Sequence, residues 1–186
     1  SRLPLHIFEP RYLAMVEDCL KTPNRLIGMV QPTGADDRLH SIGCAGKLTQ
    51  FSETEDGRYM IALNGVCRFR LHGHDLTEGG YRLAQVDWSE FAKDLEESQQ
   101  GIADRKRMFA VMRRYFAARG FDADWDQIER SEDEQNLNTL AMVCPFEVAE
   151  KQALLEADGM ARRADLLIAM MEMALHEDDG GNDARH

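Results

Sequence analysis

The spacing of apolar residues changes near residue 90, and this change constrains the fold more than any other feature of the sequence. Before it, short runs rich in Val, Ile, Leu, Phe and Tyr are separated by Gly, Asn, Asp and Pro, which is typical of strands joined by turns. After it, Gly and Pro become scarce and apolar residues recur at helical spacing. We therefore expect an α+β protein with a β-rich part over residues 1–90, a polar linker over 91–100, a helical bundle over 101–176 and a disordered acidic tail over 177–186.

The β-rich part contains several short segments with the apolar content or alternation of strands. They are residues 3–7, 26–30, 42–51, 58–63, 66–71 and 81–88. Asp56-Gly57 and Asn64-Gly65 are both turn signals. Short antiparallel strands in succession favour a small barrel or a strongly curled antiparallel sheet over parallel βαβ units.

One early helix interrupts these strands. Pro10 suits a first helical turn, where its missing N–H costs nothing. Tyr12, Leu13 and Val16 then fall on one side, and Thr22 ends the segment. Glu17, Asp18 and Lys21 fall on its outer side.

The second half is predicted to be an antiparallel helical bundle. Its first apolar stripe runs from Ile102 to Phe116 and stops at Gly120. Ser131 and Glu134 have the spacing of a capping box, and Asp158 is the predicted N-cap of the last helix. Seven of the ten methionines lie in this half. They are interpreted either as adaptable core filling or as a soft surface for varied apolar partners.

The charge balance excludes several classes of function. With 22 basic and 33 acidic residues, the net charge is −11. This balance argues against a protein that coats nucleic acid or docks on an anionic membrane. No apolar run approaches the ~20 residues of a membrane span, and we expect no secretory leader. The four cysteines form no CxxC pair, so we expect a reducing, cytoplasmic setting.

The patterns that could carry chemistry are incomplete. Gly43–Leu48 has the wrong glycine spacing and lacks the hydroxyl of a phosphate-binding loop. His72 and His74 lack a third and a fourth metal ligand nearby in the sequence. Cys144, next to Pro145, is interpreted as a buried thiol rather than an activated nucleophile. We therefore expect no catalytic residue, no bound metal and no cofactor.

Four stretches together resemble the Lon protease N-terminal domain family. Pro4–Tyr12, which reads PLHIFEPRY, resembles its "PL-x-IFE-x-RY" signature before an amphipathic helix. Asp56–Tyr59 and Asn64–Leu71 are similar to the family's hairpin and its "G-x-x-RF-R" strand, and Pro145–Glu156 is similar to its "K-Q-x-LLE" helix. The resemblance covers essentially the whole chain. The signature residues singled out here are Pro4, Phe8, Glu9, Arg11, Tyr12, Gly65, Arg68 and Phe69.

The resemblance implies a PUA-like β pseudo-barrel followed by a helical bundle, of the bacterial class that carries this domain without ATPase or protease domains. It implies a non-catalytic module that binds unfolded or exposed polypeptide segments and can form homo-oligomers. Within the signature, Glu9 and Arg11 are expected to pair at the strand–helix junction, and Phe8 and Tyr12 to be core anchors. Because family members place a further strand and an "FPG"-like turn before Pro4, residues 3–7 would be an unpaired edge if that strand were absent.

Two other functions remain open at this stage, and the sequence does not identify the partner-binding surface. A PUA-like barrel could bind RNA if Lys47, Arg68, Arg70 and Arg82 formed one local basic face. An enzyme could instead hold a small molecule between the barrel and the bundle, through convergent ionisable groups in a deep pocket.

Overall fold

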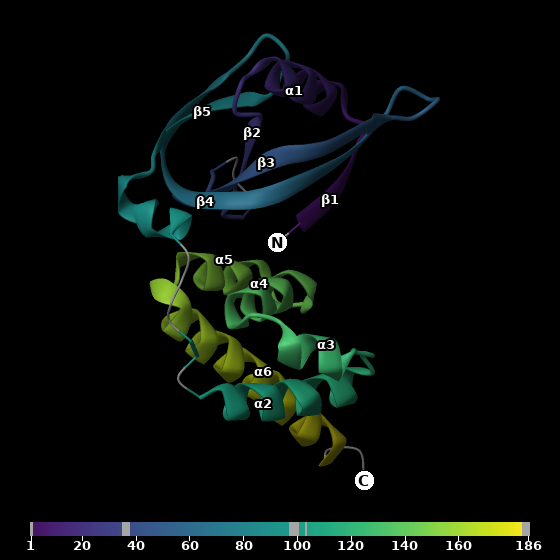
Figure 1. Cartoon of the computed structure of the whole chain (residues 1–186), viewed down its shortest axis with the longest axis vertical. Coiled ribbons are helices and arrows are strands. Elements are labelled where there is room, and N and C mark those ends of the chain that lie inside the picture. The colour runs from purple at the N-terminus through teal and green to yellow at the C-terminus, as the bar shows by residue number, and fades with distance from the viewer. Residues whose placement is uncertain (1, 35–37, 97–100, 103, 184–186) are drawn as a thin grey trace. The chain divides into compact units, whose positions relative to one another are not determined.

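The computed structural model divides the chain into two compact units, Ser1–Glu97 and Ser98–His186 (Figure 1). It describes residues 2–34, 38–96, 101–102 and 104–183, and the side chains of 178–183 lie outside the description. The first unit holds an antiparallel sheet and one α-helix, and the second is helical. An α+β fold was predicted, and the two kinds of structure follow each other along the chain as the apolar spacing indicates.

The sheet of the first unit is antiparallel throughout, with the order β1-β4-β3-β2, and β5 pairs with the other end of β4. Its elements are β1 (Arg2–Ile7), α1 (Pro10–Lys21), β2 (Leu26–Met29), β3 (Ile42–Glu53), β4 (Tyr59–Leu76), β5 (Arg82–Asp87) and the 3-10 helix η1 (Ser89–Leu95). Pro10 occupies the first helical turn of α1, as predicted.

Strand β4 corrects one prediction. Asn64-Gly65 was expected to be a turn, but the 18-residue strand runs straight through it. Asn64 pairs with Arg2 on one side and Lys47 on the other, and Gly65 pairs with Gly46. Pairing with strands on both sides overrides the local turn preference, because strand propensity depends strongly on context.

Three register shifts curl the sheet. One extra residue is inserted in β4 at Val66, one in β3 at Thr49 and one in β4 at His72. Each β-bulge bends its strand and increases the local twist. The two ends of β4 therefore follow different directions, as the curved β3–β4–β5 ribbon shows (Figure 1).

Helix α1 packs on one face of the sheet. Hydrogen bonds join it to the start of β4 and to the turn between β4 and β5. Its Val16 and Cys19 are buried with apolar residues of β1–β4, and the complete core cluster is Ile7, Val16, Cys19, Ile27, Leu48, Ile61 and Leu63. The Tyr59 hydroxyl donates to Glu17 at 3.0 Å, and the Tyr81 hydroxyl donates to Asp18 at 2.9 Å. The turn between β4 and β5 thus closes against α1.

The predicted linker over 91–100 begins later than expected. Residues 91–95 belong to η1, in which the Phe91 side chain is buried against the sheet. This segment is mostly polar, so no buried contact was predicted for it. Its contact with the sheet depends on a single aromatic residue and a single carboxylate. Residues 97–100 lie outside the described residues.

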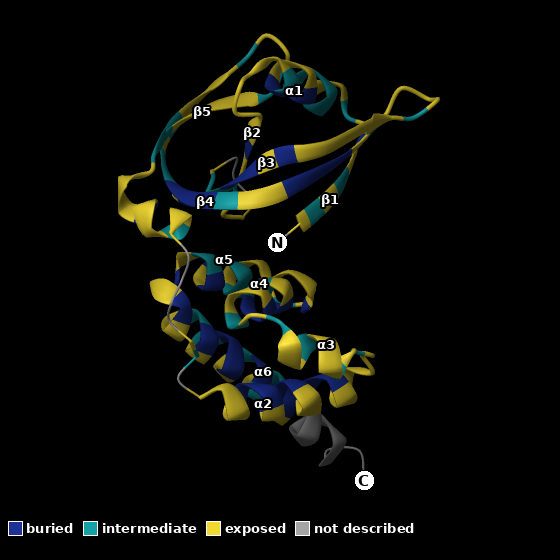
Figure 2. Cartoon of the chain, viewed as in Figure 1, coloured by how far each residue is buried: buried dark blue, intermediate teal, exposed yellow. Residues whose placement is uncertain are grey.

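The second unit contains five helices in its described part. They are α2 (Arg105–Arg119), α3 (Trp125–Arg130), α4 (Asp133–Val143), α5 (Val148–Glu156) and α6 (Gly159–Asp183). Its core joins α2, α4, α5 and α6 through fully buried side chains such as Met108, Met112, Leu137, Leu167 and Met171 (Figure 2). These three methionines therefore fill core space, which is the first of the two readings of the methionine-rich half.

Three details of the bundle differ from the prediction. Ser131 does not cap α4: its hydroxyl donates to the Gln127 carbonyl and ends the unpredicted helix α3. The capping box lies instead at Glu147 and Glu150, at the start of α5. Helix α6 continues to Asp183, whereas a disordered tail was expected over residues 177–186, and residues 184–186 of that prediction lie outside the described residues.

The first prediction concerns packing around Gly43. A Cβ at this position would lie 2.7 Å from the Met29 carbonyl oxygen and 2.7 Å from the Phe69 ring. We expect Gly43→Ala to lower the free energy of unfolding by about 1–3 kcal/mol, since neither neighbour can yield freely. Gly65→Ala is the matched control, because its Cβ would meet no atom within 4 Å. Urea denaturation of both variants checks this, and equal stabilities would contradict it.

The second prediction concerns pH. The bond to Asp18 raises the pKa of Tyr81, and the bonds from Lys21 and Tyr81 lower the pKa of Asp18. A raised pKa means that the stability Tyr81 contributes is complete at neutral pH and is lost as pH rises through that pKa. Wild type should therefore exceed Tyr81→Phe in urea midpoint at pH 7, and the difference should be lost at alkaline pH, once the pH has passed the raised pKa of Tyr81. A difference that persists there would contradict the assignment.

Candidate functional site

The signature at the start of the chain places two of its residues on the surface. In β1, Leu3, Leu5 and Ile7 pack toward α1, so the alternation of a strand directs Pro4 and His6 to the opposite face. Phe8 follows the strand and is 60% exposed. The prediction that Phe8 is a core anchor is therefore wrong. Ile7 takes the inward position, and Phe8 falls on the outward one.

Four neighbouring residues form an exposed, mainly apolar area on the face opposite α1. We name Pro4, His6, Phe8 and Met60 the β1–β4 surface. Met60 pairs directly with His6 across the two strands and is 45% exposed. The rings of His6 and Phe8 meet edge to face at 6.0 Å between centroids. Figure 2 shows the alternation of burial along β1 that produces this surface.

The adjoining turn between β3 and β4 is acidic. It carries Glu53, Glu55 and Asp56 against the single cation Arg58, which pairs with Asp56 at 3.0 Å. Ser52 is the cross-strand partner of Met60, and the acidic stretch starts at the next residue, Glu53. The turn therefore adjoins the β1–β4 surface. A ligand on the surface would experience a negative potential at this end.

The remaining residues of the first signature shape the strand–helix junction. The Arg11 guanidinium lies 2.8 Å from the Glu9 carboxylate, and both side chains are about half exposed at 47% and 42%. The same guanidinium stacks over the Tyr12 ring at 4.6 Å, and Tyr12 packs against the core. The expected pairing of Glu9 with Arg11 and the core position of Tyr12 agree with this geometry.

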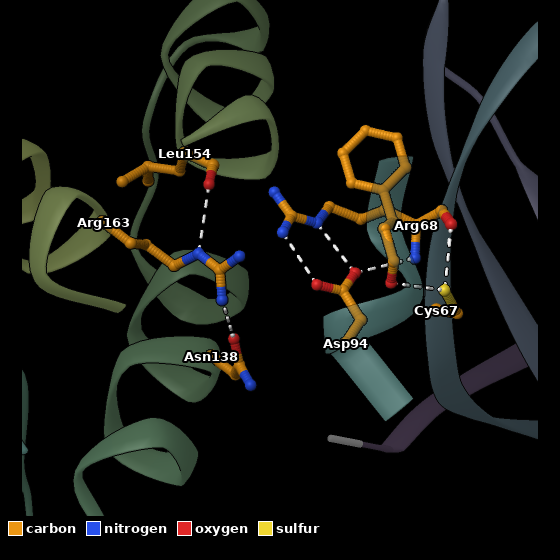
Figure 3. Close-up of polar contacts among 7 residues, drawn as sticks. Cys67, Arg68, Asp94, Asn138, Leu154 and Arg163 are labelled. Carbon is orange, nitrogen blue, oxygen red and sulfur yellow. Dashed lines mark hydrogen bonds and ion pairs between the residues drawn. The ribbon is translucent and has the colours of Figure 1, made fainter. Parts of the chain in front are cut away.

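Arg68 and Phe69 of the second signature are structural. Arg68 is 9% exposed and forms a two-pronged ion pair with Asp94, with Nε–Oδ2 at 2.8 Å and Nη2–Oδ1 at 2.7 Å (Figure 3). Its guanidinium lies 4.7 Å from the centre of the Phe91 ring, and the Cys67 thiol donates to the Phe91 carbonyl at 3.3 Å. These contacts fasten η1 to β4.

The ring of Phe69 fills space that two glycines leave open. It lies against Gly28 and Gly43 on neighbouring strands and meets Trp88 edge to face at 5.6 Å. Gly65, by contrast, faces open space inside β4. No sequence signal distinguishes these glycines from one another, because the difference comes from cross-strand register.

The basic face required for RNA binding is largely neutralised. Arg68 pairs with Asp94, and Arg70 makes a two-pronged pair with Glu90 at 2.8 and 2.9 Å. Both carboxylates come from η1, a segment that was predicted to be linker. Of the four candidate cations, two are therefore committed to the protein's own carboxylates.

The other sequence candidates do not converge. His72 Nε2 lies 3.9 Å from Asp87, and the described residues contain no group of three side chains placed to hold a metal ion. Gly43–Leu48 lies within β3 and forms no loop. Burial raises the pKa of the Cys144 thiol to about 11, so it is protonated at neutral pH and is a poor nucleophile.

The helical unit has its own internal polar link. Arg163 of α6 donates from Nε to the Leu154 carbonyl at 3.2 Å and from Nη1 to Asn138 at 3.1 Å, which ties α6 to α5 and α4 (Figure 3). Among the helices that the structure describes, none has the length and apolar content needed to cross a bilayer.

The described part of the chain is an α+β domain in which a curled antiparallel sheet with an exposed apolar area is followed by a helical bundle. The chain belongs to the family of the ATP-dependent protease La (LON) substrate-binding domain, whose sequence profile matches residues 2–173. This match confirms the resemblance read from the signature stretches.

Two solved structures have the same fold. One is a Lon N-terminal domain protein from Xanthomonas campestris, with 21% identity and a TM-score of 0.65 over 91% of this chain and 89% of that one. The other is the N-terminal domain of the Mycobacterium avium complex Lon protease, with 15% identity and a TM-score of 0.58 over 92% of this chain and 90% of that one. These similarities confirm the predicted fold class.

The third prediction compares the two ion pairs that hold η1. Asp94→Ala removes a carboxylate from a guanidinium whose side chain is 10% exposed, whereas Glu90→Ala removes one from Arg70, which is 40% exposed. We expect a loss of about 3 kcal/mol in the free energy of unfolding for Asp94→Ala and below about 1 kcal/mol for Glu90→Ala. Urea denaturation at 0.1 M salt measures both, and losses of similar size would contradict the ranking.

Proposed function

We propose that this protein is a non-catalytic module that binds unfolded or exposed segments of other polypeptides on the β1–β4 surface. The observation that carries the proposal is the exposure of Met60, the cross-strand partner of His6, and of Phe8, whose ring meets that of His6, in a chain of the LON substrate-binding family. Apolar side chains that contact water in the protein alone gain free energy when a partner covers them.

The binding mode follows from the kind of contact that the surface offers. An aromatic ring and a flexible thioether on a sheet accept many apolar side chains without a shaped pocket, which favours weak and sequence-tolerant binding. The acidic turn at Glu53–Asp56 favours basic residues beside the apolar ones. A cytoplasmic location and self-association belong to the same proposal, and both come from the sequence.

The two other functions have less support. Binding of RNA would need Arg68 and Arg70, which already pair with Asp94 and Glu90. Catalysis would need convergent ionisable groups, and the candidate histidines and Cys144 do not provide them.

The fourth prediction tests the surface directly. The probe is a fluorescein-labelled 20-residue peptide of Leu, Phe, Lys and Gly, and binding is measured by fluorescence anisotropy. We expect Phe8→Ser combined with Met60→Ser to weaken binding about tenfold, because the partner's apolar residues lose about 1.4 kcal/mol of contact. A peptide with Ser in place of Leu and Phe should bind neither protein.

The chain offers a matched control for this experiment. Leu76 and Leu83 are 72% and 62% exposed on the β4–β5 hairpin of the same unit. Leu76→Ser combined with Leu83→Ser removes comparable exposed apolar area and should change the affinity less than twofold. Equal weakening by the two double variants, or no binding of the apolar peptide by wild type, would refute the proposal. Circular dichroism confirms that both variants fold.

A further inference from the structure

We propose that Met60 is an oxidation site that regulates the β1–β4 surface, such that conversion of its thioether to the sulfoxide by hydrogen peroxide weakens polypeptide binding. The inference rests on the proposed function and adds a means of control to it. It follows from the position of Met60 in the sheet and from its exposure, compared with the other methionines of the chain.

Met60 lies at the middle of the surface and is open to solvent. Its cross-strand partners are His6 on β1 and Ser52 on β3, and both are exposed. Its neighbours along β4, Tyr59 and Ile61, belong to the face that packs with α1, so the Met60 side chain extends from the opposite face. With 45% of the residue exposed, a small oxidant can reach the sulfur.

Six of the other nine methionines are buried or only partly exposed. Met108, Met112 and Met171 have at most 1% exposure in the bundle core, and Met160 has 8%. The methionines that are substantially exposed are Met29 at 41%, Met60 at 45%, Met142 at 39% and Met173 at 62%. Peroxide should therefore modify these four first, and only Met60 is part of the β1–β4 surface.

The reaction is a balanced oxygen transfer. The O–O bond of hydrogen peroxide breaks, one oxygen forms an S–O bond with Sδ of Met60, and the other leaves as water. The sulfur is oxidised by two electrons and the peroxide is reduced by two. No metal or further co-reactant is needed.

The product changes the surface without disturbing the fold. A sulfoxide is polar and accepts hydrogen bonds strongly, so covering it with an apolar partner requires the loss of its hydration. Because Met60 extends from the solvent-facing side of the sheet and is 45% exposed, the sulfoxide can remain hydrated in the protein alone. The modification therefore acts on binding, and methionine sulfoxide reductase with a thiol reductant can reverse it.

The experiment measures binding of the same Leu, Phe, Lys and Gly peptide before and after treatment with hydrogen peroxide. Peptide mass spectrometry reports the oxidation of each methionine. We expect about fivefold to tenfold weaker binding once Met60 is oxidised, and recovery after treatment with the reductase. Met60→Leu keeps an apolar side chain of similar size but lacks the sulfur, so peroxide should leave its affinity at the value measured for the same variant before treatment.

The matched control is Met29→Leu combined with Met173→Leu, which removes two exposed methionines outside the surface. This variant should lose affinity on oxidation as wild type does. Unchanged binding of wild type after Met60 is oxidised would overturn the inference and leave the proposed function standing. Equal sensitivity of Met60→Leu to peroxide would also overturn it, because another residue would then be responsible. Absence of peptide binding before any oxidation would refute the proposed function itself and the inference with it.

Discussion

Strand β4 pairs with three different strands along its 18 residues, and the structure of the first unit depends on this pairing. Its first part pairs with β1 as far as Asn64, and its last part pairs with β5 from Arg70 onward. Between these limits the edge of β4 has no strand beside it on that side, within the described residues. The bulge at Val66 lies at the start of this gap.

Helix η1 fills the gap by hydrogen bonding rather than by strand pairing. The backbone N–H of Arg68 donates to Asp94 Oδ2 at 3.0 Å, while the Arg68 guanidinium binds the same carboxylate. A side-chain carboxylate thus takes the place of a strand carbonyl, which satisfies a buried backbone donor that would otherwise lack a strand partner. This explains why a polar stretch behaves as part of the domain: its two carboxylates, Asp94 and Glu90, meet the two arginines of the β4 signature.

The sequence predicted the features that are set locally, and it missed those that depend on distant partners. Pro10 marks the start of α1 and Gly120 ends α2 in a left-handed conformation, because both follow from backbone preferences. Asn64-Gly65 is an equally strong local signal for a turn, and Ser131 for a helix N-cap. Cross-strand pairing overrides the first, and Ser131 instead ends helix α3. Among the signature residues, alternation along β1 could have placed Phe8 outside, since Ile7 is the inward residue. The role of Asp94 could not be predicted, because it lies 26 positions from its partner Arg68.

The signature residues therefore divide by physical role. Arg68, Phe69 and Tyr12 are buried or packed. Their side chains contact neighbouring elements and hold the strands, η1 and α1 together. Pro4 and Phe8 have no such internal task, although Phe8 is large enough that burial would have stabilised the fold by about 2 kcal/mol. Strand alternation does not explain why an aromatic residue occupies the outward position, since a polar residue would fit it equally well and would lower the risk of aggregation. The exposed ring of Phe8 and the exposed thioether of Met60 support the proposed binding surface, because a polypeptide partner that covered them would remove this apolar area from water.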